Sequence, residues 1–238
     1  MHTFGTLFVV ATPIGNLEDI TLRALRVLQE CDYILCEDTR VTKKLLKHYG
    51  IDTKLKRYDA HTSEHTHENI IAELRSGQRI ALVSDAGTPG ISDPGVRLVE
   101  QTRALKIPIE AIPGPSALTA AISIAGCSGN QFTFLGFVPQ KKGRETFFTN
   151  LEQYPHPVVF FESTHRIVRT LTMLAKIYPE RKLMVARELT KLHEEVLSGT
   201  PDEIRSLLED EPVKQKGEFV LLFNNQISRK GKNTKSQV

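Results

Sequence analysis

The chain has 238 residues, of which 40% are hydrophobic and 25% are charged, proportions typical of a globular protein with a sizeable core. No apolar run approaches the ~20 residues that a membrane span needs, and the first residues lack the pattern of a secretory signal. The three cysteines form no CxxC pair, which predicts free thiols in a reducing cytoplasm.

The net charge of +3 is unevenly distributed along the chain. The segment 226–238 contains four basic residues and no acidic one, so the remaining 27 basic and 28 acidic residues give the body a charge of −1. This segment has no apolar pattern, and we expect a disordered basic tail. The tail either serves solubility or binds phosphate.

Apolar segments rich in β-forming residues alternate with helical patterns in the first half of the chain. Strands are expected over residues 6–12, 33–38, 80–84 and 109–112, and helices over 20–31, 42–49, 68–75, 94–105 and 115–125. Such alternation predicts a mostly parallel sheet with helices on both faces.

Two glycines and several polar residues interrupt this pattern at residues 126–131, which marks a domain boundary. Strands are then expected near 132–137, 158–162, 183–187, 194–198 and 219–223, with helices near 144–151, 164–177 and 201–208. We therefore expect an α/β domain over 1–126, a smaller α/β domain with a mixed sheet over 127–225, and the tail over 226–238.

The most distinctive segment is SDAGTPGISDPG at residues 84–95, which leaves a strand and enters a helix. Ligands of open α/β sheets bind at the carboxyl ends of strands, and three glycines allow a close approach of the backbone. The segment lacks the Gly-Lys-Ser/Thr of a Walker A loop and the spacing of a GxGxxG loop. The alternative interpretation is an irregular structural turn.

Two further loops rich in proline and glycine follow strands, ATPIGN at 11–16 and IPGPSA at 112–117. A single Pro-Gly pair usually indicates only a turn. Three such loops at strand ends of one domain can wall one ligand crevice.

The second half places charged side chains directly after buried strands, in FESTHR at 161–166 and ARELTK at 186–191. One interpretation is a set of surface salt bridges among Glu162, Glu188, Arg166 and Arg187. The other is a functional polar cluster, and the pattern by itself does not choose between them.

Two polar loops have ordinary interpretations. The basic loop KKGR at 141–144 is either solvated or a phosphate contact. His61, Glu64, His65 and His67 have no cysteine or HExxH context, so we expect a polar loop and no metal site.

Seven segments occur in order across residues 9–222: VATPIGNLEDIT, EDTR, VSDAGTPGISDPG, PGPSA, FESTHR, ARELTK and KGEFVLL. Together they resemble the class III, tetrapyrrole methylase-like methyltransferases. Within these they resemble the bacterial enzymes that methylate the ribose 2′-hydroxyl of a decoding-centre cytidine in 16S ribosomal RNA. The turn Gly87-Thr88-Pro89 is similar to the Gly-Asp-Pro turn of tetrapyrrole methylases, and its threonine argues against a tetrapyrrole substrate.

The resemblance implies a two-domain α/β fold, S-adenosylmethionine bound in a cleft between the domains, a homodimer, and 16S rRNA in the assembled small subunit as the substrate. The residues expected to bind the cofactor are Pro13, Gly87, Thr88, Ile91, Ser92, Pro113, Ser116, Ala117, Phe161 and Ala186.

A ribose hydroxyl is a weak nucleophile, so a positioned proton acceptor should accelerate methyl transfer by ~10²–10⁴-fold. Glu162 is the first candidate and Glu188 the second, with Arg187 beside them. The side chains expected to contact RNA are Lys141, Lys142, Arg144, His165, Arg166 and Lys191.

Two other functions stay open at this stage. One is a small-molecule methyltransferase of the same fold, and the other is a non-catalytic RNA-binding protein. The near-neutral body fits poorly with binding of naked RNA, which usually requires a larger basic face. An assembled ribosomal subunit as the substrate would resolve this tension.

Overall fold

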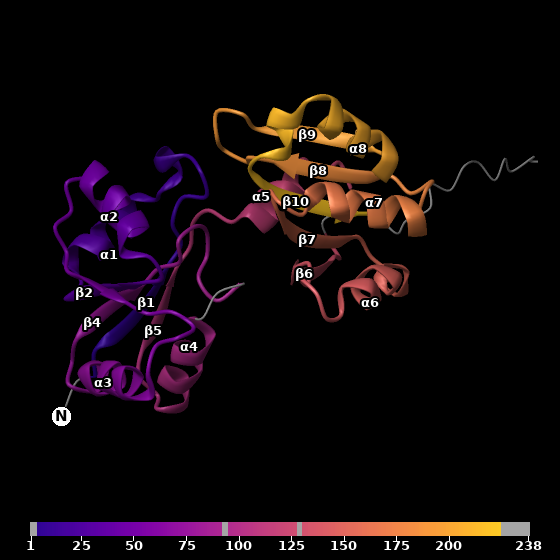
Figure 1. The fold of residues 1–238 in the computed structure, drawn as a ribbon. Coiled ribbons are helices and arrows are strands. Elements are labelled where there is room, and N and C mark those ends of the chain that lie inside the picture. Colours follow the sequence, from indigo (N-terminus) through magenta and orange to yellow (C-terminus); the bar gives the residue numbers. More distant parts are fainter. Residues whose placement is uncertain (1–3, 92–94, 128–129, 225–238) are drawn as a thin grey trace, which may run out of the picture. The chain divides into compact units, whose positions relative to one another are not determined.

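The computed structural model describes residues 4–91, 95–127 and 130–224. The chain divides into two compact units, Met1–Ala120 and Ala121–Val238, and each contains one five-stranded sheet (Figure 1). The division falls within a helix that precedes the glycine-rich segment. The boundary at residue 126 therefore stays a prediction.

The sheet of the first unit has the strand order β3-β2-β4-β1-β5, and all its strand pairs are parallel. Its strands are β1 (Thr6–Val10), β2 (Tyr33–Cys36), β3 (Leu55–Arg57), β4 (Arg79–Leu82) and β5 (Ile109–Ile112). Its helices are α1 (Leu22–Glu30), α2 (Thr39–His48), α3 (Glu64–Arg75), α4 (Gly95–Ala104) and α5 (Ala117–Ile124), the last of which crosses into the second unit.

Helices cover both faces of this sheet, as the alternation predicts. Apolar residues of α1 and α2 pack with Phe8 and Val10 on one face, and residues of α3 and α4 pack with Leu7 and Leu35 on the other. Figure 1 shows α1 and α2 on the opposite side of the sheet from α3 and α4. The α/β class and the parallel sheet are therefore confirmed.

The segment that contains three histidines differs from the expected polar loop. Helix α3 begins at Glu64, because the Ser63 side chain caps it by accepting a hydrogen bond from the Thr66 amide. His67 is thereby buried, with Nδ1 2.8 Å from the Tyr58 hydroxyl. Among the described residues, no group of His, Cys, Asp and Glu side chains could hold a metal ion.

The second unit has a mixed sheet with the order β6-β7-β10-β8-β9, in which only β6 and β7 pair in parallel. Its strands are β6 (Thr133–Phe137), β7 (Val158–Ser163), β8 (Leu183–Arg187), β9 (Glu195–Gly199) and β10 (Glu218–Phe223). Its helices are α6 (Arg144–Thr149), α7 (Ile167–Ile177) and α8 (Pro201–Asp210), and the short 3₁₀ helices of the chain are η1 (Leu17–Asp19), η2 (Leu151–Gln153) and η3 (Pro212–Gln215).

The three helices of this unit pack on one face of its sheet. Phe160 of β7 and Leu221 of β10 share a core with Leu171 of α7 and Ile204 of α8. Successive side chains of a strand point to opposite faces. The residues next to Phe160 and Leu221 in sequence therefore point away from these helices.

Candidate functional site

The loops that follow β1 and β4 are joined at the carboxyl edge of the first sheet. Thr12 and Gly87 exchange two backbone hydrogen bonds, of 2.9 and 3.0 Å, and form an isolated antiparallel bridge. The Thr12 hydroxyl also donates to the Ser84 carbonyl at 3.1 Å. Thr12 and Ser84 are both buried, so this link is shielded from water.

The loops after β5 and β2 join the same edge. The Thr88 hydroxyl donates to the Pro115 carbonyl at 3.1 Å, and the Asp38 amide donates to Asp85 Oδ1 at 3.0 Å. Four of the five strands thus send their carboxyl-terminal loops to one connected edge. This is the edge at which open α/β sheets bind ligands.

Two glycines give this edge its backbone shape. Gly87 and Gly90 have φ values of +81° and +83°, in the left-handed region that other residues adopt at a penalty. A Cβ atom on Gly87 would lie 3.3 Å from Ile14 Cγ2, whereas a Cβ on Gly90 would meet open space.

The cofactor-binding residues predicted in the first unit lie around this edge, apart from Ser92, which is outside the described residues. Gly87 is buried, Pro13, Thr88, Ser116 and Ala117 are half-buried, and Pro113 is exposed. Ile91 exposes 46% of its surface.

Glu162, the first candidate for a proton acceptor, is enclosed in the core of the second unit. Its side chain has no exposed surface. Oε1 accepts a hydrogen bond from the Ser163 amide at 2.8 Å. The same oxygen pairs with Arg166 Nη2, also at 2.8 Å. Oε2 accepts from the Thr170 hydroxyl at 2.5 Å and lies 3.4 Å from Arg144 Nη1. Because both oxygens are occupied, the geometry disagrees with a role as general base.

Arg144, whose guanidinium is predicted to contact RNA, is likewise enclosed by the protein. The side chain is 5% exposed, and it donates to Thr170 Oγ1 at 2.6 Å and to the Pro139 carbonyl at 3.2 Å. Arg166 is one-fifth exposed and donates to the Val138 carbonyl at 2.8 Å. Both guanidinium groups therefore bind the protein itself, whereas Lys141, Lys142 and His165 are exposed.

Arg187 also has a structural environment. It is 7% exposed, and its guanidinium donates to the carbonyls of Lys216, His193 and Val213 at 2.9, 3.1 and 3.3 Å. It thereby ties the loop before β9 to the segment between α8 and β10. Arg187 Nη1 also lies 4.0 Å from a carboxylate oxygen of Glu195.

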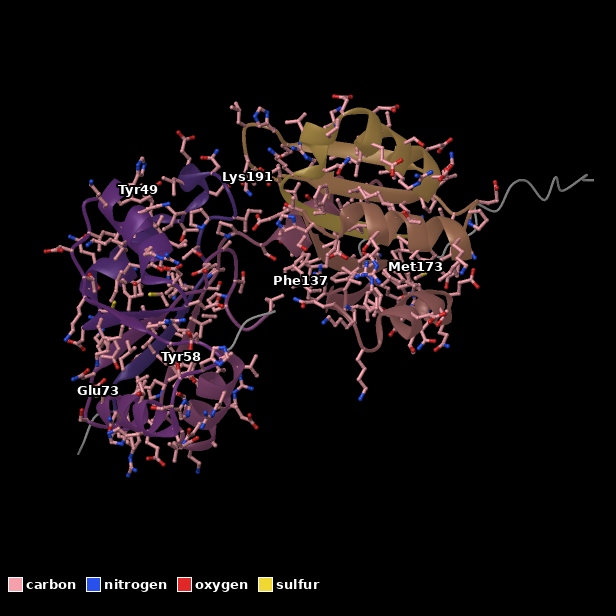
Figure 2. The ribbon with its side chains drawn as sticks, in the orientation of Figure 1. Tyr49, Tyr58, Glu73, Phe137, Met173 and Lys191 are labelled. Carbon is pink, nitrogen blue, oxygen red and sulfur yellow. The ribbon has the colours of Figure 1, made fainter. Side chains whose placement is uncertain are left out.

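Glu188 is the predicted catalytic carboxylate that reaches solvent. Its side chain is 18% exposed, and Oε1 accepts from Lys191 Nζ at 2.8 Å and from the Glu218 amide at 3.0 Å (Figure 2 labels Lys191). Although partial burial raises the pKa of Glu188, these hydrogen bonds outweigh it and hold the pKa below its ordinary value. Glu188 and Thr190 have φ values of +52° and +65°, a strained backbone of the kind found at functional sites.

Phe161 and Ala186, the cofactor-binding residues predicted in the second unit, lie in one row across its sheet. Phe161 is opposite Val220, and Val220 is opposite Ala186. Cross-strand partners share a face, so this row points away from α6, α7 and α8. Ala186 is fully buried and Phe161 is half-buried.

Sequence reasoning missed two residues that shape these sites. Thr170 lies four residues after Arg166, a spacing that brings side chains together on a helix. Asp85 follows β4, whose neighbour β2 is followed by Asp38. For Thr170 the signal is a helical spacing. For Asp85 it depends on knowing that β2 and β4 are neighbours in the sheet.

The comparisons with known proteins agree with these features. The family model of tetrapyrrole (corrin/porphyrin) methylases matches residues 6–205. The chain belongs to this methylase family. A relative from Neisseria meningitidis named ribosomal RNA small subunit methyltransferase I is 48% identical over 220 residues, which cover 92% of this methylase and 76% of the relative. A relative from Thermotoga maritima with the same name is 43% identical, over 92% of this methylase and 98% of the relative.

Solved structures share the fold of this methylase at low sequence identity. A cobalt precorrin-4 methyltransferase has a TM-score of 0.68 at 16% identity, over 92% of this methylase and 94% of that chain. A uroporphyrin-III-C-methyltransferase from Thermus thermophilus has a TM-score of 0.61 at 20% identity, over 93% and 94%. The predicted class III fold is confirmed, and so is the predicted relationship to ribosomal RNA methyltransferases.

No helix among the described residues has the length and apolar character that a membrane crossing requires.

Proposed function

We propose that this methylase transfers the methyl group of S-adenosylmethionine to the ribose 2′-hydroxyl of a decoding-centre cytidine in 16S ribosomal RNA. The observation that carries the proposal is the similarity, at 43–48% identity over 92% of the chain, to relatives named for the small-subunit RNA. The ribose hydroxyl and the cytidine are the finer part of the proposal, and they come from the resemblance of the sequence motifs.

The carboxyl edge of the first sheet fits the cofactor chemically. S-adenosylmethionine combines a flat base, a ribose and a charged amino-acid part, so it needs an apolar surface beside backbone donors and acceptors. Ile91 supplies exposed apolar surface, and Gly90 has open space where other residues carry a Cβ atom. We assign binding there to Pro13, Gly87, Thr88, Ile91, Ser92, Pro113, Ser116 and Ala117. In the second unit, Phe161 and Ala186 remain proposed cofactor contacts.

The bound cofactor supplies a methyl group already activated by its positive sulfonium, so the protein contributes mainly alignment and electrostatics. Holding reactants in line provides ~7–11 kcal/mol in well-oriented systems. The bridge between Thr12 and Gly87 and the bond from Thr88 to Pro115 keep the loops in one arrangement without further ordering. This rigidity is the contribution of the chain to alignment.

We assign the hydrogen bond from the substrate hydroxyl to Glu188 Oε2 rather than to Glu162. Both hydrogen bonds to Glu188 described above end on Oε1. With its pKa held below the ordinary value, the carboxylate is ionised at neutral pH, and Oε2 can accept a hydrogen bond. Lys191, fixed by Glu188 and Glu218, then offers a positive charge beside the acceptor.

The proposed partner is the assembled small ribosomal subunit, and we expect the active form to be a homodimer in the cytoplasm. An assembled subunit presents RNA in a fixed shape, so a near-neutral protein body suffices for recognition. A small-molecule methyltransferase on this fold is the alternative that a substrate test separates.

The test is to incubate the protein and labelled methyl donor with small subunits from a strain that lacks the modification. A ribose 2′-methyl blocks alkaline cleavage at that nucleotide, so mapping the label to an alkali-resistant cytidine supports the proposal. Label on a base, or on a nucleotide outside the decoding centre, contradicts its finer part. No label on subunits together with methylation of a tetrapyrrole contradicts it entirely.

A further inference from the structure

We propose that the loop 138–144 and the first turn of α7 form a binding face for RNA phosphates, with Lys141, Lys142 and Arg169 as the contacts. This inference rests on the proposed RNA substrate and adds a surface to it. The buried residues Arg144 and Glu162 and the half-buried Arg166 support this phosphate face from inside.

The phosphate face is a local concentration of positive charge. Residues 138–145 and 162–170 contain five basic side chains and two acidic ones, whereas residues 1–225 together carry a charge of −1. Lys141, Lys142 and Arg169 are exposed, and none of the three has an ion pair among the residues that the structure describes. Exposed and unpaired cations on a nearly neutral body favour an anionic partner.

The internal support holds the start of the lysine loop at Val138 and Pro139 and its end at the buried Arg144. Arg166 Nη1 holds the Val138 carbonyl at 2.8 Å, and Arg144 Nη1 holds the Pro139 carbonyl at 3.2 Å. Glu162 then pairs with both guanidinium groups, and Thr170 bridges Glu162 to Arg144. The loop that carries Lys141 and Lys142 is therefore anchored in the core, so its backbone loses less conformational entropy when the lysines bind.

Arg169 adds an exposed cation from α7. It lies three residues after Arg166, so the two side chains are neighbours at the start of the helix. Figure 2 shows side-chain nitrogen atoms gathered between α6 and the part of α7 that carries Met173. Burial lowers the pKa of Arg144, and the nearby charges of Arg169 and Arg166 oppose its protonation as well. The carboxylate of Glu162 thus neutralises only part of the positive charge around it. Bound phosphates would offset the remaining positive charge.

RNA fits this face better than a small anion does. The contacts come from a loop and a separate helix turn, so they suit a chain of phosphates rather than one phosphate. Phosphate contacts of this kind position a nucleic acid without reading its sequence. The sequence-independent part of substrate binding is therefore assigned here.

The first test compares two double variants of equal charge change, Lys141→Ala/Lys142→Ala and Lys176→Ala/Lys182→Ala. Lys176 lies about two turns beyond Arg169 on α7. Lys182 directly precedes β8. Phe223 pairs with the first residue of β8 and also with the first residue of β7, so Lys182 lies near the start of β7. The control lysines are thus at the other end of the helix and of the sheet.

The measurement is the salt dependence of binding to a single-stranded RNA oligonucleotide and to unmodified small subunits. Each neutralised phosphate contributes about −0.7 to the slope of log K against log salt for single strands. Lys141→Ala/Lys142→Ala should lower the magnitude of this slope by about 1.4, and Arg169→Ala by about 0.7, while the control pair leaves it unchanged. Equal slopes for the test and control pairs would overturn the proposal.

The second test asks whether the internal support positions the lysines. Thr170→Val removes the hydroxyl between Arg144 and Glu162 without changing charge. The control variant Thr170→Ser retains the hydroxyl. Thr170→Val should weaken RNA binding in the wild-type background and have a smaller effect in the Lys141→Ala/Lys142→Ala background, with Thr170→Ser close to wild type. Equal effects in both backgrounds would mean that the network is merely structural, which contradicts the positioning role.

Failure of this proposal and failure of the proposed function are distinguishable. If wild-type protein methylates small subunits but the KM of Lys141→Ala/Lys142→Ala matches that of the control pair, the phosphate face is wrong and the function stands. If wild-type protein methylates no subunits, the function is wrong, and the oligonucleotide slopes still decide the phosphate face.

Discussion

Phe161 and Glu162 are consecutive residues of β7, yet their side chains point to opposite faces of the second sheet. Glu162 lies on the face covered by helices, where Arg144, Arg166 and Thr170 enclose its carboxylate. Phe161 lies in the row with Val220 and Ala186 on the other face. The residue predicted for catalysis and the residue predicted for the cofactor are thus separated by the sheet itself, which favours a structural role for Glu162.

Replacing Glu162 by Gln should destabilise the protein strongly. The change leaves the buried guanidinium of Arg144 and the half-buried one of Arg166 without their shared anion, and breaking a buried ion pair costs about 3–5 kcal/mol. Chemical denaturation measures the free energy of unfolding, and the methylation rate is normalised to folded protein. The matched control is Glu152→Gln, which breaks an exposed pair with Arg181 and should cost at most about 1 kcal/mol. A stable Glu162→Gln variant that methylates at least ~10²-fold more slowly would restore the general-base role.

Gly87→Ala should be more damaging than Gly90→Ala, although both glycines have the same left-handed backbone. The backbone penalty of about 1–2 kcal/mol applies to each. At Gly87 the new Cβ also crowds Ile14 Cγ2 and disturbs the bridge to Thr12, whereas at Gly90 it meets open space. Calorimetry with S-adenosylmethionine and thermal unfolding check the pair. Equal losses of cofactor affinity would show that the bridge does not shape the site.

Thr88→Val should weaken cofactor binding while Thr88→Ser retains it. Valine has nearly the same shape but lacks the hydroxyl that donates to the Pro115 carbonyl, a hydrogen bond worth ~0.5–1.5 kcal/mol net. The loops after β4 and β5 would then lose their side-chain link. We expect the dissociation constant to rise several-fold in titration calorimetry. An unchanged constant for Thr88→Val would mean that the two loops hold their positions independently.

Stability should fall in alkaline solution partly through Cys31. Burial raises the pKa of its thiol from 9.0 to about 11 in the folded protein. Since the folded pKa is the higher one, this contribution to stability is intact below pH 9 and is lost as the pH rises to about 11. Denaturant unfolding between pH 8 and 11 measures it, with Cys31→Ala as the control that should show a shallower decline. Identical pH profiles for the two proteins would contradict this role of Cys31.

The sequence by itself determined the class of the fold and the family. Alternating strand and helix patterns indicated the parallel sheet, and the proline- and glycine-rich segments indicated the loops at its carboxyl edge, because these signals are local. Strand β3 escaped prediction, since Leu55-Lys56-Arg57 has one apolar residue and is ordered by pairing with β2. Even the opposite faces of Phe161 and Glu162 follow from the period of a strand, once residues 158–163 are known to be a strand.

Only the tertiary structure decided which charged residues are buried and which are exposed. The sequence gives Lys141, Lys142 and Arg144 in one basic run, but Arg144 turns inward to a carboxylate 18 residues later, while the lysines stay in water. A guanidinium is stable in the core only beside an anionic or hydrogen-bonding partner, because an unpaired buried charge is too costly. That partner comes from another strand and helix, so its presence depends on packing between elements distant in sequence.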